Sequence, residues 1–428
     1  MVIQLATNAV GDIGTWQNSD GGVKEDPTNI TRITRALRHA AADGTPQIVY
    51  YQSGVGCGGT IDKIVGGGTG AGLGEHVREA YGFLAHNFYP GDTIHLFGFS
   101  RGAYTARSIC GLICRLGVLK KRGMDNFYDI YQDYVTGRLR DDAVVAELHA
   151  REDGSWVHPN IVVTTIGCFD TVGSLGIPTL PIPLLGHAVS GVFNGKKYSF
   201  HDTDLSPRVL HAFHALALDE KRAPFTPAMW HKAPNNTTTE LRQCWFPGVH
   251  TNVGGGYPDQ EIADMTLAWM IERTKTWLEW DFDYLRGIFK NGGGGGDRRE
   301  WAEGKIYNSR TGMMRLAGTM QRTPGEYHAP NETGECVHVS VRVRKNVLGD
   351  WKGGALKGWW WSDQEKCWCA PGSDGTKLKE DWLGDIEKEL AGRDIVERLL
   401  GWAFPGEDVV NEKSPPDERI VESMRNGK

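Results

Sequence analysis

One short stretch limits the possible folds of this chain more than any other. Residues 95–103 read HLFGFSRGA and contain the pattern Gly-x-Ser-x-Gly centred on Ser100. The pattern lies between a short apolar segment and a long segment with helical spacing, which is the strand–turn–helix order of a nucleophile elbow. Glycine suits the flanking positions because strand and helix approach closely there. The stretch predicts that Ser100 is a nucleophile and that the chain is a serine hydrolase.

The segments beside Ser100 favour this interpretation over a chance match. The chain has 56 glycines, so the pattern alone could arise in an ordinary loop. However, residues 94–99 are mostly apolar, as in a buried strand. After the serine, apolar residues recur at helical spacing: Ala103, Ala106, Ile109, Cys110, Ile113 and Leu116.

Strand-like and helix-like segments alternate along the first 280 residues. Strands are expected at residues 47–51, 94–99, 160–169 and 241–246, and helices at residues 29–42, 75–87, 103–116 and 262–278. The segment 210–216 has a helical pattern, whereas residues 1–12 show no clear strand and are expected to be partly irregular. The alternation predicts an α/β fold, in which a mainly parallel, α/β-hydrolase-like sheet carries helices on both faces.

The pattern also suggests where the catalytic domain ends. We expect an α/β-hydrolase-like catalytic domain over residues 1–345, with insertions and a flexible glycine-rich loop at 291–297. Residues 346–428 are expected to form an extension that is helical around 378–400 and ends in a disordered tail. The glycine-rich segment 66–74 lacks the Gly-Lys-Ser/Thr ending of a phosphate loop, so we interpret it as a cover or gate over a cleft.

The net charge and the cysteines indicate which kinds of partner molecule and which cellular compartment to expect. The formal net charge of −6 disfavours nucleic-acid binding. The eight cysteines show no zinc-type spacing, and four of them (Cys110, Cys114, Cys168 and Cys244) lie in expected buried elements. No metal or other cofactor is therefore expected, and a reducing, cytoplasmic compartment is favoured. No apolar leader opens the sequence and no run of about 20 apolar residues occurs, although leaderless secretion and peripheral membrane contact stay open.

A serine nucleophile needs an imidazole to take its proton and a carboxylate to orient that imidazole. In α/β-hydrolases these groups follow the serine in the order acid, then histidine, each at the end of a strand. Asp170 fits the acid because it ends the apolar run 162–169, while Asp202 and Asp204 are reserve candidates in a loop-like segment. A cap of a loop or helix is the ordinary alternative for such an aspartate.

His250 fits the base best. It follows the expected strand 241–246 and precedes the glycine-rich residues 251–257, so we place it on a loop that reaches the elbow. His211 and His214 lie in the segment with a helical pattern, where a structural role is expected, and His214 is the stronger competitor.

The developing oxyanion needs two backbone donors. The N–H of Arg101 directly follows the nucleophile at the start of a helix, which favours one of them. We expect the second, Thr15, from the turn Gly14-Thr15-Trp16 that precedes the first expected helix.

Several of these segments together resemble one family. They are the motifs GFSRGA at 98–103, FDTVG at 169–173, PGVH at 247–250, VGGGY at 253–257, GTW at 14–16, PTNI at 27–30 and ALALDE at 215–220. The chain resembles the uncharacterised α/β-hydrolase domain shared with type VI secretion phospholipase effectors, over about residues 11–345. The resemblance implies an α/β-hydrolase fold, ester hydrolysis and, as in some members, cleavage of phospholipid acyl esters. It maps the nucleophile to Ser100, the acid to Asp170 and the base to His250.

Two positions depart from the family pattern. Ile13 stands where the first loop usually has aspartate, and Asn252 replaces the aspartate of the glycine-rich loop. Neither belongs to the expected triad, so the leading expectation is a serine esterase, either a phospholipase or a carboxylesterase. The alternatives are a hydrolase fold kept for binding or scaffolding with weakened catalysis, and a thioesterase or peptidase with the same triad.

Overall fold

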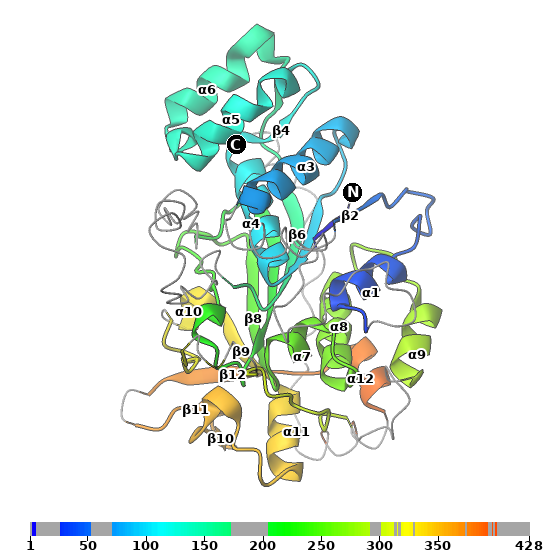
Figure 1. Ribbon diagram of the computed structural model, residues 1–428, viewed down its shortest axis with the longest axis vertical. Coiled ribbons are helices and arrows are strands. Elements are labelled where there is room, and N and C mark those ends of the chain that lie inside the picture. Colours follow the sequence, from blue (N-terminus) through cyan, green and yellow to red (C-terminus); the bar gives the residue numbers. More distant parts are fainter. Residues whose placement is uncertain are drawn as a thin grey trace, which may run out of the picture.

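The architecture is a long, mainly parallel sheet with helices on both faces (Figure 1). The computed structural model describes residues 2–5, 26–52, 71–172, 204–291, 301–311, 315, 318–327, 330–372, 375–392, 396 and 399. Its ten-stranded sheet has the order β10-β11-β12-β9-β8-β7-β6-β3-β1-β2. The strands are β1 Val2–Leu5, β2 Val49–Gln52, β3 His95–Phe99, β6 Val163–Phe169, β7 Val209–Ala217, β8 Glu240–Phe246, β9 Glu335–His338, β10 Trp360–Ser362, β11 Cys367–Cys369 and β12 Lys377–Asp381.

The strands from β12 to β2 are paired in parallel, and only β10 and β11 run antiparallel to their neighbours. The carboxyl ends of the central strands β3, β6 and β8 are followed directly, or within four residues, by Ser100, Asp170 and His250. Because carboxyl ends of parallel strands meet at one edge of the sheet, the topology brings these residues to the same edge.

Two apolar cores explain why the central strands read as continuous hydrophobic runs. Along β3, Leu96 packs with α3 (Ala71–Asn87) and α4 (Arg101–Leu116), whereas Phe97 packs with α1 (Asn29–Ala36), α8 (Glu261–Thr274) and α9 (Phe282–Asn291). Strands that are buried on both faces need apolar residues at every position. The predicted fold class, a parallel sheet covered on both faces, is therefore confirmed.

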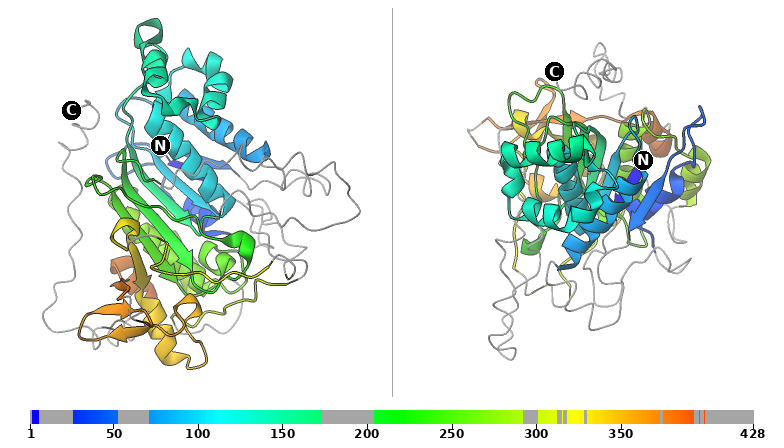
Figure 2. Two further views of the ribbon diagram at one scale, coloured as in Figure 1. Left: turned by 90° about the vertical axis from the view of Figure 1, so that its left-hand side faces the viewer. Right: turned by 90° about the horizontal axis from the view of Figure 1, so that it is seen from above.

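The remaining elements lie outside the main sheet and its covering helices. The helices α5 (Phe127–Val135) and α6 (Asp142–Ala150) lie at the end opposite β10, β11 and α11 (Val339–Val347) (Figure 2). The other elements are the two-stranded sheet of β4 (Val118–Leu119) and β5 (Val157–His158), the short helices α7 (His250–Gly254) and α10 (Pro330–Thr333), and α12 (Asp385–Ala391). Among the described residues, no helix has the length and apolar character needed to cross a membrane.

Four expectations about local structure are wrong. Residues 209–217 form strand β7 and not a helix, because Ala212 and Phe213 are buried on opposite faces of the sheet and no polar alternation marks the strand. The first helix stops at Ala36, since Leu37 is extended and pairs with Trp280. Residues 2–5 form β1, which the neighbouring strands β2 and β3 hold on both sides. Finally, residues 377–381 form β12, so the helical part of the segment 378–400 begins only at α12.

The C-terminal part continues the sheet of the catalytic part. β12 pairs in parallel with β9, and β11 and β10 extend the sheet beyond it. The domain boundary at residue 345 stays a prediction. The predicted loop residues 292–297, most of the glycine-rich segment 66–74 and the tail 401–428 lie outside the described residues.

Candidate active site

Ser100 occupies a strained turn between β3 and α4. Its backbone has φ 59° and ψ −122°, a left-handed combination that costs a residue with a side chain about 1–3 kcal/mol. The Ser100 N–H donates to Phe169 O at 3.1 Å, which fastens the turn to the end of β6. The strand–turn–helix order and the positive φ of Ser100 are those expected of a nucleophile elbow. One feature differs from an open elbow: Ser100 is only 3% exposed.

Gly98 makes this close turn possible. A Cβ atom at Gly98 would lie 2.5 Å from Ala103 N, Ala103 Cα and Gly102 O, well inside van der Waals contact. The atoms that it would meet are backbone atoms of α4, which have no rotamer to change. The first glycine of the motif therefore reflects the close packing of helix on strand.

We expect Gly98→Ala to lower the free energy of unfolding by about 3 kcal/mol or more, because the added methyl group forces β3 and α4 apart. Urea unfolding measures the change. The matched control is Gly287→Ala in α9, where no atom lies within 4 Å of the added Cβ. That variant should be neutral or up to about 1 kcal/mol more stable. Equal midpoints for both variants would contradict the packing argument.

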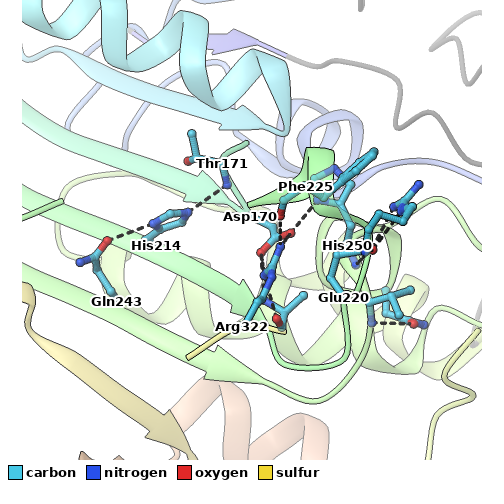
Figure 3. A network of polar contacts seen from close by, with 12 residues as sticks. Asp170, Thr171, His214, Glu220, Phe225, Gln243, His250 and Arg322 are labelled. Atoms are coloured by element: carbon cyan, nitrogen blue, oxygen red, sulfur yellow. Dashed lines mark hydrogen bonds and ion pairs between the residues drawn. The ribbon is translucent and has the colours of Figure 1, made fainter. Parts of the chain in front are cut away.

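Asp170 and His250 form a buried pair beside the elbow (Figure 3). Asp170 follows β6 with φ 42°, and its Oδ2 accepts a hydrogen bond from His250 Nδ1 at 2.6 Å. Both side chains are fully buried. The structure thus brings together the predicted acid and the predicted base. The prediction that His250 lies on a loop is wrong, because His250 begins the short helix α7.

The Asp170 carboxylate has more partners than His250. Arg322 binds it with both terminal nitrogens, Nη1 to Oδ1 at 2.5 Å and Nη2 to Oδ2 at 2.8 Å, and Ala217 N–H donates to Oδ1 at 3.0 Å. Burial alone would raise the pKa of Asp170, but the charge of Arg322 and the hydrogen bond from His250 hold that pKa well below its ordinary value. Asp170 is therefore an ionised acceptor for the Nδ1–H of His250.

The surroundings of the His250 ring favour its neutral form. It packs between the Phe99 and Phe225 rings, with centroid separations of 4.7 and 4.8 Å. Burial lowers the pKa of His250, and the bond to Asp170 opposes this shift without reversing it. With Nδ1–H donated to Asp170, the Nε2 atom carries the lone pair. Nε2 is buried and has no hydrogen-bond partner, so no bond joins it to Ser100 in this state.

The competing residues are used elsewhere. His214 accepts the Thr171 N–H at Nε2 and bonds Gln243 Oε1 through Nδ1, so both ring nitrogens are occupied. Burial lowers the pKa of His214 to about 3. His211 binds Glu240, and the exposed Asp204 binds His231. These contacts give His214, His211 and Asp204 structural partners.

Three expected residues and one departure from the family pattern still need to be placed. Thr15 and Asp202 lie outside the described residues, and Arg101 begins α4 directly after the nucleophile. Asn252 fixes the segment around α7, since its Oδ1 accepts from Val249 N and its Nδ2 donates to Lys305 O at 2.9 Å. An aspartate at this position would lack that donor.

Three charged residues of the site were missed by the sequence analysis: Glu220, Arg222 and Arg322. Glu220 is buried, binds Arg222 and accepts the His250 N–H at 3.3 Å. Burial alone would raise the pKa of Glu220, but Arg222 holds it at about 2. The Arg222 guanidinium lies 3.5 Å from the centroid of Phe225. The motif ALALDE contains Glu220, but no pattern in the sequence marks Arg322.

Among the described residues, two groups have donor atoms close enough to hold a metal ion: Cys244, Cys336 and Asp381, and Glu365, Cys367 and Cys369. Asp381 is already bound to Arg242 and Arg273, and Glu365 to Lys377. Neither group lies among the residues around Ser100 described above.

Comparisons with known proteins point to one family. Residues 12–273, more than half of the chain, match the family described as "T6SS, Phospholipase effector Tle1-like, catalytic domain". An uncharacterised protein of Saccharomyces cerevisiae, YEL023C, is 29% identical over 220 residues, which is 46% of this chain and 29% of the yeast protein. The crystal structure of an uncharacterised protein from Pseudomonas aeruginosa matches 63% of this chain and 45% of that chain with 15% identity and a TM-score of 0.32. The chain thus spans less than half of each of these relatives.

Proposed function

We propose that this chain, which belongs to the family of Tle1-like type VI secretion phospholipase effector catalytic domains, is a serine hydrolase of acyl esters. In this proposal Ser100 is the nucleophile, His250 the general base and Asp170 the residue that orients His250. The main support is the 2.6 Å contact between Asp170 Oδ2 and His250 Nδ1, which leaves Nε2 of a neutral imidazole without a partner beside the strained elbow. A neutral imidazole held in this tautomer is what proton removal from a serine requires.

The reaction proceeds in two steps that use the same nitrogen. As Ser100 Oγ attacks the carbonyl carbon, His250 Nε2 takes its proton and then gives it to the departing alcohol. Water, deprotonated by the same Nε2, then attacks the acyl-serine, the carboxylic acid leaves, and the Ser100 oxygen takes the proton back from Nε2. The Arg101 N–H at the start of α4 and the Thr15 N–H are the proposed oxyanion donors.

We propose phospholipid acyl esters as the substrate class, because the family is a phospholipase family. This substrate implies contact with a membrane surface, without a membrane-spanning helix among the described residues. A simple carboxylic ester or a thioester uses the same triad and differs only in the acyl donor. A cytoplasmic location belongs to the same proposal and is supported by the absence of disulfides among the described cysteines.

One observation favours a second candidate, a binding or scaffolding protein with weak catalysis. Ser100 is 3% exposed and makes no hydrogen bond to His250 Nε2. An ester reaches the serine only after neighbouring groups move, and a fold kept for binding would not need this movement. The two candidates differ in whether the serine reacts.

A substrate panel separates these candidates. We expect the protein to release fatty acid from phosphatidylcholine–phosphatidylethanolamine vesicles and to hydrolyse p-nitrophenyl butyrate, both measured against heat-inactivated protein. Turnover of the small ester without fatty acid release would replace the phospholipase with a carboxylesterase. Turnover of an acyl thioester alone would indicate a thioesterase. If the protein hydrolyses none of these esters and is not labelled by a fluorophosphonate, the binding or scaffolding function would be favoured over the hydrolase.

A further inference from the structure

The site receives one residue from beyond the segment that matches the family. The match ends at residue 273, whereas Arg322 lies in the segment 318–327. That segment runs along residues 221–223: Ala223 N donates to Gly318 O, Met320 N donates to Lys221 O, and Arg222 pairs with Thr319. Backbone contacts between these two segments therefore hold the chain close to Arg322 in place, independently of the bonds that its side chain makes.

Every terminal donor of Arg322 has an acceptor. Besides the two Asp170 oxygens, Nη1 donates to Ala217 O at 2.7 Å and Nη2 to Phe225 O at 2.9 Å. The side chains of Arg322 and Asp170 are both fully buried. A planar guanidinium with four fixed bonds holds a carboxylate in one orientation. Figure 3 shows Asp170 bound in this way to both Arg322 and His250.

The buried charges of this site are balanced when His250 is neutral. Besides Asp170 itself at the end of β6, the groups that interact with the Asp170–His250 pair are His214 on β7, Glu220 and Arg222 after β7, and Arg322. His214 is neutral, because burial lowers its pKa to about 3. Asp170 and Glu220 then carry two negative charges, and Arg222 and Arg322 two positive charges. Without Arg322 the cluster would carry one net negative charge next to the imidazole, which favours a proton on that ring.

We propose that Arg322 is a positioning residue of the catalytic site: it aims the Asp170 carboxylate at His250 Nδ1 and keeps His250 in the neutral form that accepts the serine proton. The inference rests on the proposed function. It extends the catalytic site beyond residue 273, so that the segment matching the family is not sufficient for catalysis.

The pH dependence separates this role from a merely structural one. Asp170 and His250 share a proton and titrate as a pair. Acid protonates the pair and removes the base, so reactivity falls as the pH drops through the apparent pKa of the pair. A nearby positive charge makes this protonation harder. Losing Arg322 must therefore raise the apparent pKa and move the acid limb to higher pH.

The experiment compares three variants of the full chain: Arg322→Gln, Arg322→Lys and the control Arg273→Gln. Arg273 also binds a buried carboxylate, that of Asp381, but at β12, away from the elbow. The second-order rate constant of fluorophosphonate labelling is measured from pH 5 to 9. In parallel, the ¹³C NMR shift of His250 Cε1, assigned with His250→Gln, gives the titration midpoint without any turnover.

For Arg322→Gln we expect labelling at pH 7 to slow by about 10- to 100-fold and both midpoints to rise by about one pH unit or more. Arg322→Lys keeps the charge but not the paired bonds, so its midpoints should stay near those of the wild type while labelling slows about tenfold. Arg273→Gln should lower stability and leave the midpoints unchanged.

Two results would overturn the proposal: unchanged midpoints in Arg322→Gln, or wild-type labelling rates in Arg322→Lys. If Arg322→Gln does not fold, the labelling rate and the titration midpoint of His250 in Arg322→Lys decide whether Arg322 is a positioning residue. A wild-type protein that does not react with the fluorophosphonate would instead refute the proposed hydrolase function, and the NMR midpoints would still decide whether Arg322 controls the proton on His250.

Discussion

Replacing Ser100 with alanine is expected to reduce ester hydrolysis by about 10³- to 10⁶-fold and to abolish fluorophosphonate labelling. The reason is chemical, because the Ser100 hydroxyl is the proposed nucleophile and alanine has no group that could attack the ester. The residual rate would come from the oxyanion donors and from substrate binding, which remain in the variant. Initial rates on p-nitrophenyl butyrate and gel fluorescence of the labelled protein measure the two effects.

The fold should survive this substitution. The Ser100 side chain makes no capping hydrogen bond to α4, and alanine and serine meet the same backbone cost at φ 59°. We therefore expect a melting temperature at or slightly above that of the wild type. Loss of activity in Ser100→Ala then reflects lost chemistry and not unfolding.

Ser108→Ala is the matched control for Ser100→Ala. Ser108 lies two turns further along α4, is buried, and donates its hydroxyl to Tyr104 O at 2.9 Å. Its removal should cost about 1 kcal/mol of stability and leave labelling intact. Labelling that persists in Ser100→Ala would place the nucleophile elsewhere and refute the assignment of the elbow.

The fold class and the elbow could be predicted because their signals are local. The strand, turn and helix around Ser100 are consecutive in the sequence, and Gly98 is required by contacts with residues only five positions away. Asp170 and His250 were found from a rule about chain order and strand ends, which the parallel topology turns into proximity. The triad itself stays a proposal, but the residues that it needs are brought to one edge of the sheet.

The features that could not be predicted from the sequence depend on contacts between residues far apart in the chain. Strand β7 was misread because its residues face two cores and show no alternation. Helix α1 ends early because Leu37 pairs with Trp280, a residue more than two hundred positions away. Arg322 reaches Asp170 across 152 positions of sequence, and an isolated arginine in a polar segment resembles any surface arginine. Each of these features is set by tertiary contacts that a single sequence does not reveal.

Asp170→Asn is expected to lower kcat by about 10⁴-fold, because an amide no longer holds the His250 tautomer whose Nε2 accepts a proton. The same change leaves the Arg322 charge buried without its counter-charge, which should cost about 3–5 kcal/mol of stability. Both effects follow from one carboxylate that accepts bonds from His250 and Arg322. Steady-state rates measure the first effect and urea unfolding the second.

A double variant tells these two effects apart. In Asp170→Asn/Arg322→Met no buried charge remains in this ion pair, so much of the lost stability should return, as it does when buried ion pairs are replaced by apolar groups. Hydrolysis should stay as low as in the single variant, because the orienting carboxylate is still absent. Asp381→Asn, at the remote buried pair with Arg273, serves as control and should lose stability while keeping full activity. Recovered activity in the double variant would mean that Asp170 acts only by balancing the charge of Arg322, and not by orienting His250.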